Sequence, residues 1–456
     1  MLPDRISSFI SDHIEDFTRE LVQFLAIPSV STLSEHSDDV LSAARWVFDQ
    51  LERCGFKGRI YPTERHPIVL ARSPEVSGAP VLLIYGHYDV QPPEPLDEWH
   101  TPPFSPDIRD GFIYARGASD DKGQFLTYIK AVEAVLGAEG KLPINLIVLA
   151  EGEEEIGSPN LEKFLVDHRD ELRADAVTIS DGSQIAPGSP AITYGLRGLS
   201  YLQIDIRGPR FDVHSGVFGG IIHNPAQVLV DMLQKLKNPD GTVAIPGFYD
   251  DVLGLEDWER KEMVSTPADI DALMNYLGVS ELTGEPGYSV TERSTARPTL
   301  DINGLWGGFS GEGAKTIIPA RAGAKVSMRL VPNQVPERID QLFMRFVKDL
   351  CPAGVSVEFK GIHHADPVLI NRNTSRMLAA ERAIESGFGK KPRFKREGGS
   401  IPVVNLFRKH LDQENILLLG WGSPDDGVHS PNERFCLDDF HRGIRSAAAL
   451  FYEIAR

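Results

Sequence analysis

The sequence predicts an α/β protein whose mainly parallel sheet carries helices on both faces and is interrupted by an inserted α+β domain. Between residues 81 and 181, short apolar strands alternate with helical patterns, which is the order found in parallel sheets. From about residue 195 the strands alternate polar and apolar residues, as half-exposed antiparallel strands do. From about residue 372 the buried type of strand returns. Because 456 residues exceed one ordinary core, we expect two domains.

The elements of the first domain follow from the spacing of its apolar residues. We expect helices over residues 4–25, 37–51, 122–136 and 159–166, and buried strands over 81–85, 144–150 and 176–180. After the insertion we expect helices over 377–385, 403–410 and 437–455, and a strand over 416–419. This domain then comprises residues 1–196 and 368–456 and carries the predicted site described below.

The inserted domain, residues 197–367, combines alternating strands with amphipathic helices. Strands are expected over 200–208, 322–332 and 355–360, and helices over 225–237 and 336–350. Asn224 and Pro225 begin the first of these helices, with asparagine at the N-cap and proline at the first helical position. The stretch 247–285 is acidic and irregular. This order of elements is typical of a small α+β domain in which one face of the sheet is exposed to solvent.

The composition excludes several classes of partner. A net charge of -18 argues against binding to nucleic acid or to an anionic membrane surface, and solubility is its ordinary explanation. The three cysteines are far apart and form no CxxC, so neither a disulfide framework nor a structural zinc site is expected, and a cytoplasmic location fits. No signal peptide and no bilayer-spanning stretch are apparent.

The most informative segment is YGHYDVQP at residues 85–92, which follows a buried strand. This strand delivers His87 to the carboxyl edge of the sheet, where open α/β sheets place their sites. Asp89 is placed to accept a hydrogen bond from the second imidazole nitrogen, which would fix the tautomer of a metal-binding histidine. His-x-Asp alone is a weak signal, and its weight comes from further segments of the same kind.

Four such segments lie near strand ends, and each also has an ordinary explanation. Asp120 and Asp121 suit the start of a helix. The run EGEEEIGS at 151–158 can be a solvated loop, although it leaves a buried strand. Asp181 can belong to a turn and His429 to the surface. Jointly, two histidines and three carboxylates at strand ends form a donor set that suits two Zn²⁺ or Mn²⁺ ions.

These motifs resemble the M20 metallopeptidase family, in its carnosinase-like (cytosolic non-specific dipeptidase) branch. The matching segments, in family order, are YGHYDVQPP, EWHTPPFSP, DGFIYARGASDDKG, EGEEEIGS, HSGVFGG, KTIIPARAGAKVSMRLVPN, EGGSIP and VHSPNE. They extend from about residue 85 to residue 433, which is most of the chain. The resemblance implies two divalent metal ions, with Zn²⁺ expected first and Mn²⁺ or Co²⁺ as alternatives.

The resemblance also implies how the metal ligands are divided. His87 and Asp181 would bind one ion, Glu155 and His429 would bind the other, and Asp120 would bridge both. It further implies a cis peptide bond between Asp120 and the residue that follows it.

The same resemblance implies that Glu154 is the general base and that Asp89 orients His87. Three consecutive glutamates, Glu153 to Glu155, leave the register of base and ligand open by one residue. We place the base at Glu154 because Ile-Gly-Ser follows the last two glutamates directly.

For the inserted domain the resemblance implies a lid and a homodimer interface. His214 would reach the partner subunit's active site and stabilise the oxyanion there. Thr316, Arg329 and Ser400 would hold the free carboxylate of the substrate. Arg329 has an independent rationale, because arginine binds carboxylates in a bidentate fork. A loop histidine and an exposed strand arginine are the ordinary alternatives.

The implied activity is hydrolysis of dipeptides or short peptides with a free C-terminus. An alternative is an N-acyl or N-carbamoyl amino acid amidohydrolase at the same site, which a substrate panel would distinguish. A protein that only binds metal or peptide would hydrolyse nothing. A metal-independent hydrolase would resist EDTA, but the chain has no GxSxG motif.

Overall fold

The computed structural model describes residues 2–265, 269–399 and 401–456, and the chain forms two compact units. Unit 1 comprises Met1–Tyr194, Ile370–Lys395 and Val403–Arg456, and unit 2 comprises Gly195–Leu369 and Arg396–Pro402. The chain therefore enters unit 2 a second time near its C-terminal end. The sequence analysis placed this short return segment in the first domain.

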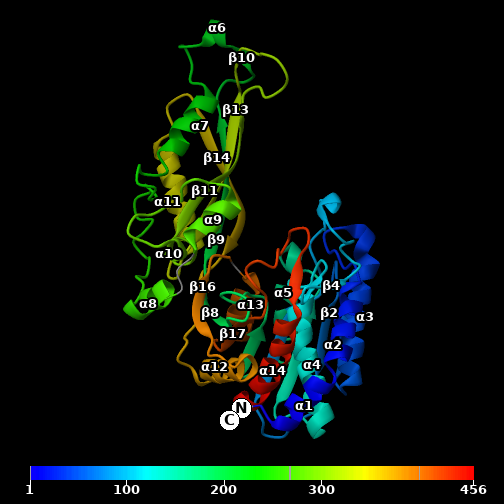
Figure 1. Ribbon diagram of the computed structural model, residues 1–456. Coiled ribbons are helices and arrows are strands. Elements are labelled where there is room, and N and C mark those ends of the chain that lie inside the picture. The colour runs from blue at the N-terminus through cyan, green and yellow to red at the C-terminus, as the bar shows by residue number, and fades with distance from the viewer. Residues whose placement is uncertain (1, 266–268, 400) are drawn as a thin grey trace. The chain divides into compact units, whose positions relative to one another are not determined.

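The main sheet of unit 1 has a parallel centre (Figure 1). Its strand order is β1-β2-β6-β3-β7-β17-β8, and the central strands β6, β3, β7 and β17 are mutually parallel. The strands are β1 (Lys57–Tyr61), β2 (Ile68–Arg72), β3 (Val81–His87), β6 (Asn145–Glu151), β7 (Ala176–Ile179), β8 (Ala191–Leu196) and β17 (Ile416–Gly420), and β15 (Val368–Leu369) and β16 (Arg393–Glu397) also pair with β8. The mainly parallel sheet expected from the sequence is therefore present.

The antiparallel margins of this sheet were not predicted. Strands β1, β2 and β8 run antiparallel to their neighbours. β1 is a short edge strand with mostly exposed residues, so it lacks the apolar run that identifies a buried strand. β8 is buried along its whole length, but it is directly followed by the first strand of unit 2, which obscured its end.

Helices cover both faces of the sheet, as neighbouring residues of β3 demonstrate. Tyr85 packs its ring against Phe407 of α13, whereas a Cβ at Gly86 would meet Phe125 of α4. Successive strand residues face opposite ways, so these helices lie on opposite faces. The helices of this unit are α1 (Asp4–Asp12), α2 (Ile14–Leu25), α3 (Ser37–Arg53), α4 (Lys122–Glu139), α5 (Leu161–Asp167), α12 (Ser375–Phe388), α13 (Pro402–Leu411) and α14 (Leu437–Ile454).

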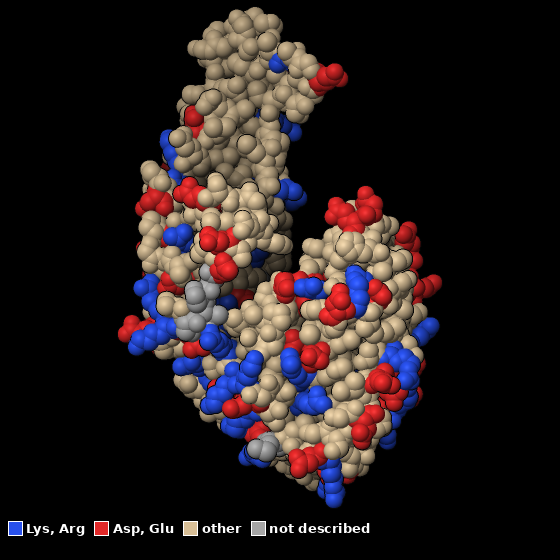
Figure 2. Space-filling view, in the orientation of Figure 1, with Lys and Arg blue, Asp and Glu red and all other residues tan. Residues whose placement is uncertain are grey.

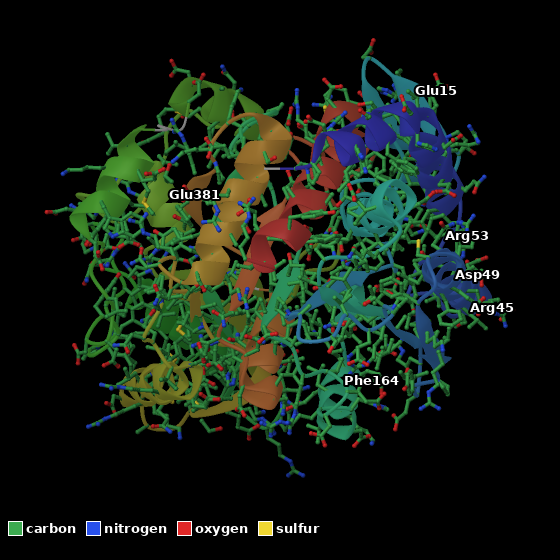
Figure 3. The ribbon with its side chains drawn as sticks, turned by 90° about the horizontal axis from the view of Figure 1, so that it is seen from below. Glu15, Arg45, Asp49, Arg53, Phe164 and Glu381 are labelled. Atoms are coloured by element: carbon green, nitrogen blue, oxygen red, sulfur yellow. The ribbon has the colours of Figure 1, made fainter. Side chains whose placement is uncertain are left out.

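The outer helices are amphipathic. On α3, Arg45, Asp49 and Arg53 project away from the unit (Figure 3), while Val47 and Leu51 of the same helix are buried. The single helix expected over residues 4–25 is two helices, α1 and α2, separated by a turn at position 13.

A small three-stranded sheet in unit 1 brings distant loops together. Its strands β4 (Asp107–Arg109), β5 (Phe112–Tyr114) and β18 (Arg434–Cys436) have the order β18-β5-β4. Tyr114 pairs in register with Arg434. The loop after β5 and the loop before β18 therefore lie side by side, although more than 300 residues separate them.

Unit 2 is an α+β unit built on a four-stranded antiparallel sheet. The order is β11-β13-β9-β14, with β9 (Gly198–Arg207), β11 (Thr299–Gly307), β13 (Arg321–Leu330) and β14 (Ser356–Ala365). Residues of α7 (Pro225–Gln234) and α11 (Pro336–Asp349) share one apolar core with this sheet, and burial alternates along β9. The edge strand β11 was not predicted because its residues are mostly exposed and include a bulge.

The remaining elements of unit 2 are short. They are β10 (Val213–His214), α6 (Ser215–Phe218), α8 (Asp257–Ser265), α9 (Ile270–Leu277), α10 (Val290–Thr295) and β12 (Ile317–Ile318). In both units, no helix within the described ranges is long and apolar enough to cross a membrane.

Candidate metal centre

Neighbouring parallel strands of unit 1 carry four of the predicted residues to one edge of the sheet. His87 ends β3 and pairs in register with Glu151, which ends the adjacent strand β6. Glu154 and Glu155 follow directly in a short 3-10 turn. Asp181 comes just after β7, the neighbour of β3 on its other side. Two further residues arrive on the paired loops of the small sheet, since Asp120 precedes α4 and His429 precedes β18.

Two groups of possible metal ligands meet at Asp120. The first consists of His87, Asp120 and Asp181, and the second consists of Asp120, Glu155 and His429. Within each group the ligand atoms lie within 4.8 Å of one another. All five ligands named in the sequence analysis thus come together, and one carboxylate belongs to both groups.

The two oxygens of Asp120 face different imidazoles. Its Oδ1 lies 3.1 Å from His87 Nε2, and its Oδ2 lies 2.9 Å from His429 Nε2. His429 Nε2 also lies 3.3 Å from Glu155 Oε2. This is the arrangement in which one carboxylate can bridge two ions, each of them also bound by a histidine.

The electrostatics of the cluster favour cations. Burial opposes the protonation of His87, but hydrogen bonds with Asp120 and Asp89 leave its pKa well above the ordinary value. Hydrogen bonds with Asp120 and Glu155 raise the pKa of His429 to about 10. The carboxylates therefore stabilise positive charge at both imidazoles, and divalent ions bound to the same nitrogen atoms would take the place of protons. The residues present therefore fit a two-metal site.

Asp89 has a different set of contacts from the one predicted. The nearest atom of Asp89 to His87 Nδ1 is its backbone oxygen, at 3.1 Å, whereas its carboxylate oxygen lies at 3.5 Å. That carboxylate accepts hydrogen bonds from the backbone nitrogens of Glu154 and Glu155, at 3.2 and 3.1 Å. Asp89 is fully buried. Its carboxylate holds the glutamate turn beside His87, and its backbone oxygen contacts the imidazole ring.

The acidic run after β6 divides into structural and site-facing carboxylates. Glu151 accepts hydrogen bonds from the hydroxyls of Tyr85 and Ser158, and burial raises its pKa to about 8. Glu153 accepts hydrogen bonds from the backbone nitrogen of His66, the hydroxyl of Thr63 and the side-chain amide of Asn160. The carboxyl groups of Glu151 and Glu153 therefore bind other groups of the protein and have a structural role.

Glu155 belongs to the ligand cluster, and Glu154 interacts electrostatically with members of that cluster. Glu155 Oε2 accepts a hydrogen bond from Gln91 at 2.8 Å and faces His429. Burial raises the pKa of Glu154 well above its usual range; His87 opposes this, and the negative charge of Asp181 adds to it. A buried carboxyl group with a raised pKa beside a metal site has the properties of a general acid or base.

The Asp120-Asp121 pair does not cap a helix with its side chains, which was the ordinary explanation of the motif. Asp121 is the N-cap residue of α4, yet its side chain makes no cap hydrogen bond. It is fully buried and accepts a hydrogen bond from the backbone nitrogen of His87 at 3.3 Å. The peptide bond between the two aspartates is cis, as the resemblance implied.

The sequence analysis missed Glu433 as a supporting residue. Its fully buried carboxylate accepts hydrogen bonds from Arg116 Nη1 at 2.7 Å and from the backbone nitrogens of Gly117, Ser119 and Asp120 at 2.9, 2.9 and 3.1 Å. Glu433 therefore connects the loop that carries Asp120 to the loop that carries His429. The VHSPNE motif contained this glutamate, but its partners lie more than 300 residues away.

The other predicted residues belong to unit 2 or lie outside the described residues. His214 is exposed at the end of β10, and its Nδ1 accepts a hydrogen bond from Gly216 at 2.9 Å. Thr316 is its neighbour, since β10 pairs with β12. Arg329 is half-buried near the far end of β13, roughly 26 Å along the strand from the end nearer β12. Ser400 lies outside the described residues.

Comparisons with known proteins identify the family of this chain. The sequence pattern of Peptidase family M20/M25/M40 matches residues 83–453. The chain is 34% identical to the Cys-Gly metallodipeptidase dug1 of Schizosaccharomyces pombe over 99% of this chain and 98% of the relative. It is 32% identical to the Beta-Ala-His dipeptidase of Homo sapiens over 100% and 93% of the two chains.

Solved structures give the same result. The crystal structure of human carnosine dipeptidase 1 is similar with a TM-score of 0.84 and 30% identity, and the match covers 100% of both chains. The M20 family metallo-carboxypeptidase Sso-CP2 from Sulfolobus solfataricus matches with a TM-score of 0.84 and 33% identity, covering 96% of this chain and 99% of that chain.

Proposed function

The chain belongs to Peptidase family M20/M25/M40, and from this premise we propose that it hydrolyses the peptide bond of dipeptides or short peptides at a site for two divalent metal ions. The observation that carries the two-metal proposal is the position of Asp120, whose two oxygens face two histidines. In this proposal His87 and Asp181 hold one ion, and Glu155 and His429 hold the other.

The proposed chemistry assigns the proton transfers to Glu154. When bound, the two ions would polarise the scissile carbonyl and lower the pKa of a water molecule. Glu154 takes the proton of the attacking water and passes it to the leaving amine. The raised pKa of its buried carboxyl group supports this role, because the protonated form is stable enough to deliver the proton. Asp89 keeps the base in place through the backbone of the glutamate turn.

The test compares three neighbouring glutamates. We expect Glu154→Gln to lower kcat by about 10²–10⁴-fold while two metal ions per chain are retained. Glu155→Gln is expected to lose metal. Glu153→Gln is the matched comparison, because its carboxylate accepts hydrogen bonds from His66 and Asn160 away from the ligand cluster, so any loss of activity there should follow a loss of stability, whereas Glu154→Gln should lose activity at wild-type stability. Turnover near the wild-type rate in Glu154→Gln would contradict the assignment.

The substrate class and the native metal need separate assays. Metal-depleted protein should regain hydrolysis of dipeptides on addition of Zn²⁺, Mn²⁺ or Co²⁺, and the most effective ion identifies the preferred metal. N-acyl and N-carbamoyl amino acids belong in the same panel. If they are hydrolysed and dipeptides are not, the dipeptidase proposal is wrong and the amidohydrolase alternative holds.

We also propose that the chain acts as a homodimer through unit 2, with Arg329 and Ser400 of one chain and Thr316 of the other binding the substrate carboxylate. His214 and Arg329 lie near opposite ends of the sheet of unit 2, so a single dipeptide is too short to contact both within one chain. A second copy that contributes His214 and its neighbour Thr316 resolves this difficulty.

The surface of unit 2 supports such an interface. Figure 2 shows few charged side chains over the end of the unit that carries β10 and α6. Exposed apolar side chains occur there at Phe211, Val217 and Ile221, and on the edge strand β11 at Ile302 and Leu305.

A cytoplasmic location is proposed as well, because Cys54, Cys351 and Cys436 are all free thiols in the described chain.

A further inference from the structure

Gln124 of α4 is a buried amide that the proposed chemistry does not use. Its Nε2 donates a hydrogen bond at 2.7 Å to the backbone oxygen of Ser119, the residue directly before Asp120. Its Oε1 accepts hydrogen bonds from the backbone nitrogens of Trp421 and Gly422, at 2.6 and 3.1 Å. One side chain of unit 1 therefore connects the loop that carries Asp120 to the end of β17.

The end of β17, residues 420–422, also holds the loop that carries Asp181. The backbone nitrogen of Gln184 donates a hydrogen bond to the backbone oxygen of Gly422 at 2.7 Å. Ser183 pairs with the same glycine in a parallel bridge. The residues that follow Asp181 are thus fixed to the segment that also binds the amide of α4.

Two glycines allow these parts of unit 1 to approach closely. A Cβ at Gly420 would lie 2.3 Å from the backbone carbonyl carbon of Gly182, the residue directly after Asp181. A Cβ at Gly422 would lie 2.5 Å from the hydroxyl oxygen of Ser119. Because neither glycine leaves room for a side chain, the segment acts as a spacer of fixed width between the two ligand loops.

The hydrogen bonds of Gln124 lie where water cannot replace them. The side chain is 3% exposed, and its neighbours Ser119 and Trp421 are 2% and 1% exposed. Buried backbone groups are costly to leave without a partner, so removal of the amide should shift the loops that it joins. Such a shift would change the distance between Asp120 and Asp181, which belong to the same group of possible metal ligands.

We propose that Gln124 is a positioning residue that fixes the spacing of Asp120 and Asp181 and thereby sets the metal affinity of their ligand group. The proposal rests on the proposed function, in which His87 and these two carboxylates hold one ion. The amide of Gln124 binds three backbone groups and acts on the ion only through the two loops.

The experiment compares Gln124→Leu with Gln413→Leu in the full-length protein. Leucine has about the volume of glutamine but cannot bind backbone groups. Gln413 is the matched control, because its buried amide also joins two backbone segments of unit 1. It donates a hydrogen bond to the backbone oxygen of Ala174 and accepts one from the backbone nitrogen of Asn415, both at 2.9 Å. These partners precede β7 and β17, at the edge of the sheet opposite the ligands.

Metal titration and thermal unfolding of both variants give the result. We expect Gln124→Leu to bind one of its two ions about 10–100-fold more weakly than the wild type. Gln413→Leu should bind both ions with wild-type affinity. Both variants should unfold at a lower temperature, because each leaves buried backbone groups without partners. Metal affinity therefore distinguishes a positioning role from a merely structural one.

Gly420→Ala tests the same connection from the side of Asp181. The added Cβ would press on the backbone of Gly182, so this variant should weaken the same ion, and it supplies the test if Gln124→Leu does not fold. If both substitutions act on one spacing, the double variant should lose less affinity than the product of the two single losses. Fully independent losses would overturn the common spacing.

The outcomes separate this inference from the proposed function. If the wild type binds fewer than two ions per chain, the two-metal proposal fails. If it binds two ions and Gln124→Leu binds both with wild-type affinity, only the positioning role of Gln124 is overturned. Equal losses of affinity in Gln124→Leu and Gln413→Leu would also overturn it, because the effect would then follow from lower stability alone.

Discussion

Asp120, the residue that both groups of possible metal ligands share, is held in position by Glu433. The backbone nitrogen of Asp120 and two preceding backbone nitrogens donate to one buried carboxylate, which also pairs with Arg116. Groups that support metal ligands in this way commonly change metal affinity by about 10–100-fold when they are removed. Glu433 is therefore a positioning residue.

We predict that Glu433→Gln weakens metal binding at least tenfold. The amide has one acceptor oxygen in place of two, so backbone N–H groups of the Asp120 loop lose their partner and the loop shifts. Metal titration of the purified variant measures the effect. Glu453→Gln is the control, because Glu453 is a buried carboxylate of α14 that pairs with Arg382, and its loss should lower stability alone. Wild-type metal affinity in Glu433→Gln would contradict the prediction.

His441 predicts acid sensitivity of unit 1. Burial lowers the pKa of His441 to about 4, and the charge of Arg445 contributes to the decrease. Between the unfolded pKa of 6.5 and pH 4, the unfolded chain binds a proton that the folded chain does not, so stability is lost as pH falls through this range. The loss can reach about 1.4 kcal/mol per pH unit.

Urea unfolding of His441→Asn and wild type at pH 7.5 and 5.5 tests this prediction. The variant should lose less stability than the wild type between the two values, because asparagine does not titrate. Comparison at each pH cancels the contributions of the metal site, which both proteins share. Equal losses in the two proteins would show that His441 does not control the acid response.

At the scale of elements, the start of α4 requires a glycine to bring Asp120 to the site. A Cβ at Gly123 would lie 2.0 Å from the backbone oxygen of Ala118 and 2.7 Å from the ring of Phe435. These neighbours belong to the loop that carries Asp120 and to strand β18, so any displacement is transmitted to the ligands.

We predict that Gly123→Ala lowers metal affinity as well as stability. Gly140→Ala at the other end of α4 is the matched control. Gly140 has φ of 71° and nothing within 4 Å of an added Cβ, so alanine there costs about 1 kcal/mol of backbone strain without reaching the site. Thermal unfolding and metal titration of both variants distinguish the two effects. Loss of metal affinity in Gly140→Ala alone would refute the argument.

At the scale of the whole molecule, the proposed dimer predicts complementation between inactive variants. Glu154→Gln and His214→Ala should each be nearly inactive alone. A mixed dimer contains one site with an intact Glu154 that receives His214 from the other chain, so random mixing should restore about a quarter of the wild-type activity. Activity assays after co-expression measure this recovery.

Disruption of the proposed interface is the control for complementation. Ile302→Glu with Leu305→Glu on β11 places charges on exposed apolar positions and should yield monomers by sedimentation. In this background the mixed variants should remain inactive. If the two inactive variants fail to complement although they form mixed dimers, His214 does not act across subunits.

The sequence by itself determined the central parallel strands, the helices that flank them and most of the candidate site. Apolar periodicity is a local property, so the parallel strands and the helices that flank them could be identified, and histidines and carboxylates at strand ends were brought to one edge by the geometry of parallel strands. The family resemblance also implied Asp120 as the shared ligand, and the structure places its two oxygens near His87 and His429.

Only the tertiary structure decided what depends on contacts between distant residues. Glu433 accepts hydrogen bonds from the Asp120 loop, and Asp89 accepts hydrogen bonds from the glutamate turn. These contacts and the antiparallel margins of the main sheet all join segments that are remote in the chain. No local pattern specifies such contacts, because they form only when packing brings the segments together and burial makes each unpaired polar group costly.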